Sequence, residues 1–175
     1  MQLTDQEKKR GVAYHEAGHA TLTLISRFFQ LTDPAIVLAP TLDKTAQSGA
    51  GPRPGAPGIC REAGLEQAEI ALGGMAGETM LARISEVEGR RIVLHDESAD
   101  FDINFVKGNL RYWKTENHLN ALTDSALETL ESNRDVFLEI AALIERSIGS
   151  RASLSKSEVE ALPGVQRLMA NKRPL

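Results

Sequence analysis

The 175-residue sequence has little that would suit a secreted or membrane-bound protein. Cys60 is its only cysteine, so no internal disulfide bond can form, and we expect a reducing setting. No run approaches the roughly 18 apolar residues of a membrane-spanning helix, and the polar residues 1–10 lack the apolar segment of a secretory signal. We therefore predict a cytoplasmic protein without a membrane span.

The sequence has no excess of positive charge, with 20 lysine and arginine residues against 24 aspartate and glutamate residues. The formal net charge of −4, without any basic stripe along the chain, argues against a nucleic-acid partner. The length predicts a single domain, residues 1–175, that can bury a core of its own. Within it we expect a metal-site part over residues 1–119 and a helical part over residues 120–175.

The most informative stretch is His15-Glu16-Ala17-Gly18-His19. Two histidines four residues apart lie on one face of a helix, with Cβ atoms about 5–6 Å apart, so both rings can reach one tetrahedral Zn²⁺. The glutamate after the first histidine is where metalloprotease helices carry the base that takes a proton from the attacking water. The alternative is a pair of core histidines beside a surface glutamate. The small residues between the histidines favour the metal site, because they leave room for an ion and a substrate.

Helical patterns flank this stretch. Thr4 and Glu7 carry the signature of a capping box, so a helix should begin there and continue through the motif to about residue 29. Its apolar residues spread around much of its circumference, which predicts a buried helix. A short apolar run with β-branched residues predicts a strand over residues 35–39. Residues 43–58, rich in glycine and proline, should form a mobile loop that could cover the cleft.

Three further helices complete a mainly α (α+β) fold with a small, short-stranded sheet. One covers residues 62–84, where three glycines suggest close backbone approach to the metal helix. A second is predicted over residues 100–117, and a long amphipathic one over residues 123–147. A short helix opened by Ser155 follows.

The third metal ligand has several candidates. Asp102 shares a helix face with Val106 and can point toward the core, which makes it the strongest. Asp100 fits better as a helix N-cap, although it is an alternative ligand. Glu78 could orient a ligand, serve as a rival third ligand or be solvated, and His95 could also ligate.

Three motifs stand in order along the chain: His15-Glu16-Ala17-Gly18-His19-Ala20, Gly73-Gly74-Met75-Ala76-Gly77-Glu78 and Ser98-Ala99-Asp100-Phe101-Asp102-Ile103. Together they resemble the peptidase domain of the FtsH family of ATP-dependent zinc metalloproteases, and the resemblance covers nearly the whole chain. It implies a zincin-like, FtsH-type fold in which His15, His19 and Asp102 bind Zn²⁺ and Glu16 is the catalytic base.

The sequence departs from the family in three respects. It contains no ATPase module and no membrane anchor, so ATP-driven unfolding is not implied. Met75 stands where the family usually has arginine. The segment rich in glycine and proline replaces residues near the family's substrate-binding edge strand.

We therefore expect a zinc-dependent endopeptidase that hydrolyses unfolded or flexible polypeptides without an ATPase of its own. The polypeptide could add as a strand to residues 36–38, and a separate ATPase or further copies of the chain are conceivable partners. The alternative is a non-catalytic zinc-binding adaptor derived from such a peptidase, in which His95 or Glu78 would close the fourth metal position. A third hypothesis is a metal hydrolase that acts on something other than peptide.

Overall fold

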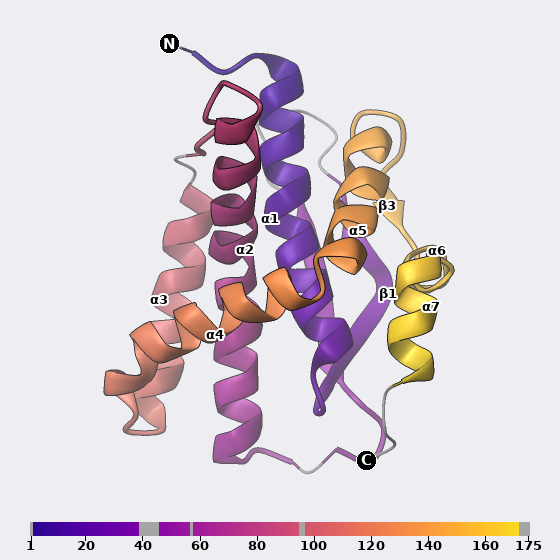
Figure 1. Ribbon diagram of the computed structural model, residues 1–175. Coiled ribbons are helices and arrows are strands. Elements are labelled where there is room, and N and C mark those ends of the chain that lie inside the picture. Colours follow the sequence, from indigo (N-terminus) through magenta and orange to yellow (C-terminus); the bar gives the residue numbers. More distant parts are fainter. Residues whose placement is uncertain (1, 39–45, 57, 95–96, 172–175) are drawn as a thin grey trace.

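The computed structural model describes residues 2–38, 46–56, 58–94 and 97–171. It is mainly helical with a small three-stranded antiparallel sheet, as expected (Figure 1). Among these residues, no helix is both long enough and apolar enough to cross a membrane. The elements, in chain order, are α1 (Asp5–Ile25), β1 (Phe29–Val37), β2 (Gln47–Pro52), α2 (Arg61–Val87), α3 (Glu97–Tyr112), the 3-10 helix η1 (Glu116–His118), α4 (Leu119–Ser132), α5 (Arg134–Ser147), β3 (Ser153–Leu154), α6 (Lys156–Glu160) and α7 (Pro163–Ala170).

Helix α1 is the central element. It begins with the expected capping box: Thr4 Oγ1 accepts a hydrogen bond from the Glu7 backbone N–H at 3.2 Å, and Glu7 Oε2 accepts one from the Thr4 backbone N–H at 2.7 Å. Twelve of its 21 residues are buried, because α2, α5, β1 and β2 all pack against it (Figure 1). The prediction of a buried helix is confirmed.

The core lies where α1, α2, α5 and the sheet meet. Helix α2 closely matches its predicted range, and the Cys60 thiol caps it by accepting a hydrogen bond from the Ala63 backbone N–H at 3.4 Å. The largest fully buried side chains are all apolar: Phe137, Leu31, Ile36, Leu38, Leu72, Leu81, Leu110, Leu130, Ile140, Ile144, Leu154 and Val106.

Helix α1 ends at Ile25, earlier than predicted. Ser26 Oγ accepts hydrogen bonds from the backbone N–H groups of Phe28 and Phe29, at 3.1 and 3.0 Å, and donates one to Glu66 Oε2 at 2.6 Å. These bonds turn the chain out of the helix and into β1. The apolar pattern of the sequence continues to Phe29 and therefore predicted a longer helix. That pattern cannot reveal the hydrogen bond between Ser26 and Glu66 of α2, which helps to end the helix.

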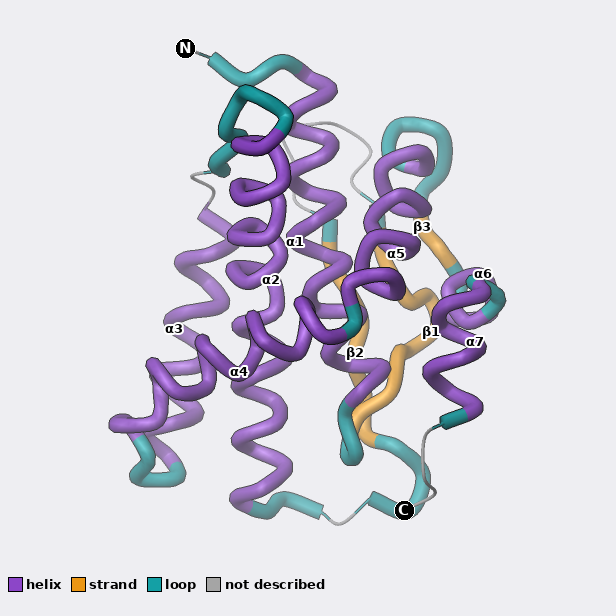
Figure 2. The backbone as a smooth tube through the Cα atoms, in the orientation of Figure 1, coloured by secondary structure: helices purple, strands orange, loops and turns teal. Residues whose placement is uncertain are grey.

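The sheet order is β2-β1-β3, with β1 at the centre (Figure 2). Ile36 pairs with Ser48 of β2 and with Leu154 of β3, so the strand predicted at residues 35–39 exists but begins earlier. The prediction of a loop over residues 43–58 is wrong at β2. Residues 39, 43–45 and 57 of these two predictions lie outside the described part of the chain.

Strand β2 lacks the residues that favour strands by themselves. It contains no β-branched or aromatic side chain, and its glycines would normally weaken a strand. A Cβ atom on Gly49 would lie 2.0 Å from Thr32 Oγ1 of β1, so the pairing requires a residue without a side chain there. Long-range pairing with β1, rather than local propensity, therefore forms this strand.

The long helix predicted over residues 123–147 is in fact two helices that meet at Asn133. Asn133 has φ −118° and ψ 34°, and its Nδ2 donates to the Thr129 carbonyl at 2.9 Å. A side-chain amide that bonds to the preceding turn competes with the helical backbone. As a result α4 and α5 run in different directions (Figure 1).

The predicted bounds of α3 also need correction, whereas the predicted start of α6 does not. Helix α3 begins at Glu97 and ends at Tyr112. Asp100 therefore lies inside its first turns and, contrary to the prediction, is not its N-cap. Several acidic residues suit a first helical turn equally well, and the acidic run could not single out one of them. The capping box at Ser155 is confirmed; α6 ends at Glu160, and Pro163 is the first residue of α7.

Candidate metal centre

The metal helix α1 and the glycine-rich face of α2 lie in backbone contact. A Cβ atom on Gly18 would lie 1.9 Å from the Gly73 carbonyl oxygen, and one on Gly77 would lie 2.2 Å from the Tyr14 carbonyl oxygen. Neither distance is tolerable for a side chain, so only glycine permits this approach. The close packing predicted from the three glycines is confirmed.

Gly74 makes room for the two imidazole rings. A Cβ atom at this position would lie 2.4 Å from His15 Cε1, 2.5 Å from His15 Nε2 and 2.7 Å from His19 Nε2. The absence of a side chain on Gly74 therefore forms one wall of a small cradle around the ring nitrogens.

Hydrogen bonds on the far side of each ring fix the histidine tautomers. His15 Nδ1 lies 2.7 Å from Glu78 Oε1, and His19 Nδ1 lies 2.8 Å from the carbonyl oxygen of Ile70. A carboxylate and a carbonyl oxygen can only accept, so the hydrogen in each case is on Nδ1. In a neutral ring, each Nε2 atom then keeps a lone pair, as metal ligation by histidine requires.

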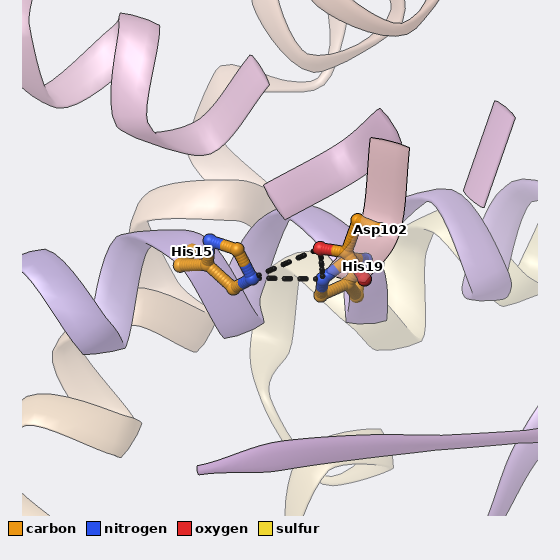
Figure 3. Close-up of side chains that lie close together, drawn as sticks. All are labelled: His15, His19 and Asp102. Atoms are coloured by element: carbon orange, nitrogen blue, oxygen red, sulfur yellow. Dashed lines mark hydrogen bonds and ion pairs between the residues drawn. The ribbon is translucent and has the colours of Figure 1, made fainter. Parts of the chain in front are cut away.

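The two Nε2 atoms and Asp102 Oδ2 form a nearly equilateral triangle (Figure 3). The Nε2 atoms are 3.1 Å apart, and Asp102 Oδ2 lies 3.3 Å from that of His15 and 3.2 Å from that of His19. Three ligands at about 2.0–2.1 Å from one tetrahedral zinc ion would be about 3.3 Å apart. The triangle therefore fits a zinc ion without rearrangement.

Asp102 Oδ2 is buried and, among the described residues, makes no hydrogen bond of normal geometry. A buried carboxylate oxygen beside the two ring nitrogens is costly unless a proton on a ring or a cation lies between them. Burial raises the pKa of Asp102, but the two histidines outweigh it and lower that pKa to about 2. Burial lowers the pKa of His15, yet the Asp102 and Glu78 carboxylates outweigh it and raise that pKa to about 10. The cluster thus attracts positive charge, which a divalent cation can supply.

Glu16 lies next to this triangle and is held in place by the sheet. Its side chain is buried, and Ser48 of β2 donates a hydrogen bond from Oγ to Glu16 Oε2 at 2.6 Å. Because β2 lies along the metal helix, it fixes the carboxylate beside the histidines rather than leaving it in solvent.

The triangle and Glu16 open into a cleft of about 600 Å³. Residues of α1, β2, α2 and α3 form its walls, among them Ser48, Gly49 and Phe101. Phe101 is 72% exposed at the rim. The site therefore combines a buried polar floor with an open cleft above it.

The structure brings most, but not all, of the predicted site residues together. His15, His19 and Asp102 form a group able to hold a metal ion, and Glu78 contacts His15 from behind. Asp100 is exposed on α3 and does not belong to the group. His95 lies outside the described residues. Ser48 was missed because its segment was predicted to be a loop, and the Ile70 carbonyl was missed because a backbone oxygen has no sequence signal.

No protein-family model matches the chain, and a search of curated proteins found no match. The resemblance to the FtsH family therefore rests on the three short motifs.

Proposed function

We propose that the chain is a zinc-dependent endopeptidase of the FtsH-like zincin type. The observation that carries the proposal is the triangle of His15 Nε2, His19 Nε2 and Asp102 Oδ2, 3.1–3.3 Å on each side, with buried Glu16 beside it. These three side chains would hold Zn²⁺. Glu78, by accepting from His15 Nδ1, orients the ring and increases the basicity of its ligating nitrogen.

The number of ligands favours a catalytic site over a structural one. Structural zinc sites are closed by four protein ligands, whereas catalytic sites use three and leave one position for water or substrate. Within the described part of the chain, no fourth histidine, cysteine or acidic residue joins the group. Glu78, one candidate for closing the site, is engaged on the opposite side of the His15 ring.

Zinc bound at this triangle would lower the pKa of a water molecule and polarise the scissile carbonyl group. The Glu16 carboxylate takes a proton from the attacking water and returns it to the leaving amine. Ser48 keeps that carboxylate oriented, since its Oγ donates to Oε2. The non-catalytic adaptor hypothesis gives no role to a buried acid held in this way.

The free edge of the sheet suggests how a polypeptide binds. Strand addition at residues 36–38 is excluded, because Ile36 is already paired on both sides, with Ser48 and Leu154. The edge strand beside the cleft is instead β2, and residues 47–50 line the cleft wall. An extended segment could add to β2 and lay its backbone across the triangle. Only unfolded or flexible segments can adopt that conformation, which defines the proposed substrates.

The proposal is tested by zinc content and by degradation of an unstructured protein, for the wild type and Glu16→Gln. We expect about one zinc per chain in both proteins, and turnover at least about 100-fold lower in the variant. Gln keeps the size of the side chain and an oxygen acceptor for Ser48, so the fold and the metal site should persist. Zinc in both proteins with turnover in neither would reject the endopeptidase and favour the adaptor.

A further inference from the structure

A second, larger hollow adjoins the metal cleft. This apolar groove has a volume of about 850 Å³ and lies between the N-terminal half of α2, the C-terminal half of α3 and the ends of β1 and β2. Its lining includes five aromatic residues: Phe28, Phe29, Phe105, Tyr112 and Trp113. Much of this apolar surface faces solvent, since Tyr112 is 71% and Phe105 40% exposed. Exposed apolar surface of this extent commonly marks a binding site.

The apolar groove and the metal cleft lie side by side. Gln67 and Phe105 line both of them. Three elements pass from one hollow to the other: β2 lines the cleft at Ser48 and the groove at Pro52, and α2 and α3 each contribute residues to both. A segment that extends along β2 beyond the cleft would therefore reach the groove.

The spacing along α3 sets the distance between the two sites. Asp102 belongs to the metal triangle, whereas Asn109 and Tyr112 line the groove. At a rise of about 1.5 Å per residue, these groove residues lie about 10–15 Å along the helix from the metal ligand. An extended polypeptide covers that span in about three to five residues.

Glycines shape both sides of this groove. A Cβ atom on Gly64 of α2 would lie 2.1 Å from Trp113 Nε1, so glycine allows the indole ring to pack closely on α2. The Tyr112 and Trp113 rings meet edge to face with centroids 4.9 Å apart. Gly108 of α3 has open space around its Cβ position. The aromatic wall is thus packed in place while the space in front of it stays free.

We propose that the apolar groove extends the substrate-binding cleft and takes a large apolar side chain three to five residues from the scissile bond. This inference rests on the proposed endopeptidase function. The occupant is the substrate itself, because the groove adjoins the cleft in which the scissile bond would lie and shares Gln67 and Phe105 with it. The substrate class is therefore narrower than flexible polypeptide: it is polypeptide with apolar residues that folding would normally bury.

The open space at Gly108 provides a test with a matched control. Gly108→Phe would fill the groove, whereas Gly108→Ala also replaces the helical glycine but does not fill the groove. The probes are otherwise polar peptides that contain a single phenylalanine or none. We expect zinc-loaded wild type to cleave bonds three to five residues from the phenylalanine, at least about tenfold faster than any bond in the phenylalanine-free peptide. Gly108→Phe should reduce this ratio below about twofold, and Gly108→Ala should retain it.

The affinity for peptide gives a second measurement that does not depend on catalysis. Trp113 is the only tryptophan in the chain and lines the groove, so its emission reports occupancy in Glu16→Gln, where peptide is not consumed. We expect the phenylalanine peptide to bind at least about tenfold more tightly, a difference lost when Gly108→Phe is added. Equal binding of both peptides, or cleavage without phenylalanine preference, would overturn the groove proposal. Phenylalanine-dependent binding without hydrolysis by the wild type would instead reject the endopeptidase and keep the groove.

Discussion

Gly74→Ala should damage the metal site although Gly74 supplies no ligand. The new Cβ atom would lie 2.4 Å from His15 Cε1, whereas non-bonded carbon atoms normally stay about 3.5–4.0 Å apart. Relief of this contact requires a displacement of about 1 Å. Zinc ligand distances tolerate only about 0.2 Å. We therefore expect the affinity for zinc to fall at least about tenfold, as it does when residues that orient zinc ligands are changed.

The same substitution has two opposing effects on the stability of the zinc-free protein. Overpacking of this kind costs about 1–3 kcal/mol, while replacing a helical glycine by alanine regains about 1 kcal/mol. The net free energy of unfolding should therefore fall by up to about 2 kcal/mol. Gly108→Ala isolates the propensity effect, because no atom lies within 4 Å of its Cβ position.

The assay is competition for zinc against a chromophoric chelator, combined with urea unfolding of the zinc-free proteins. Weakened zinc binding in Gly74→Ala, with wild-type binding in Gly108→Ala, would support the cradle around the histidines. Wild-type zinc affinity in Gly74→Ala would refute the inferred position of the rings.

Three other changes probe the surroundings of the site. Glu78→Ala removes the acceptor for His15 Nδ1, so chelator competition should show zinc affinity reduced about 10–100-fold; an unchanged affinity would mean that Glu78 does not position the ring. Ser48→Ala removes the donor to Glu16, so steady-state kinetics should show kcat reduced about tenfold or more at unchanged zinc content, and loss of zinc instead would contradict this role. Burial raises the pKa of Glu66, but hydrogen bonds from Ser26 and Arg27 outweigh it and hold that pKa below its usual value near 4.5. The unfolded chain then binds the proton more readily, so the stabilisation is present above pH about 4.5 and is lost at lower pH. Urea unfolding between pH 7 and pH 3 should show a smaller loss of stability for Glu66→Gln than for the wild type, and equal losses would rule out this contribution.

Local patterns predicted the parts of the fold that depend on neighbouring residues. The capping box at Thr4 and Glu7 is local, because both partners lie within one helical turn. The glycines at Gly73 and Gly77 indicated close helix packing, because a residue with no side chain inside a helix is unfavourable unless another backbone lies against it. These predictions needed only spacing and residue type.

The features that were missed depend on residues distant in the sequence. Strand β2 forms only because β1 pairs with it, and its own residues predict a loop. The end of α1 depends on Glu66, 40 residues beyond Ser26. The apolar pattern continues across Asn133, so it predicted one helix where the structure has two. The hydrogen bond from the Asn133 side chain to Thr129, which accompanies the break, leaves no trace in the spacing of apolar residues. Ser48 was therefore absent from the predicted site even though it holds Glu16.

The assignment of the metal ligands is the claim on which the proposed function rests. The most direct test measures bound zinc and degradation of an unstructured protein in the same samples of wild type, Asp102→Asn and Asp100→Asn. Asp102 Oδ2 lies within 3.3 Å of both histidine Nε2 atoms, whereas Asp100 is exposed on the same helix. Zinc and turnover should be lost together in Asp102→Asn and retained together in Asp100→Asn. Retention of zinc in Asp102→Asn, or its loss in Asp100→Asn, would contradict the metal centre described for this protein.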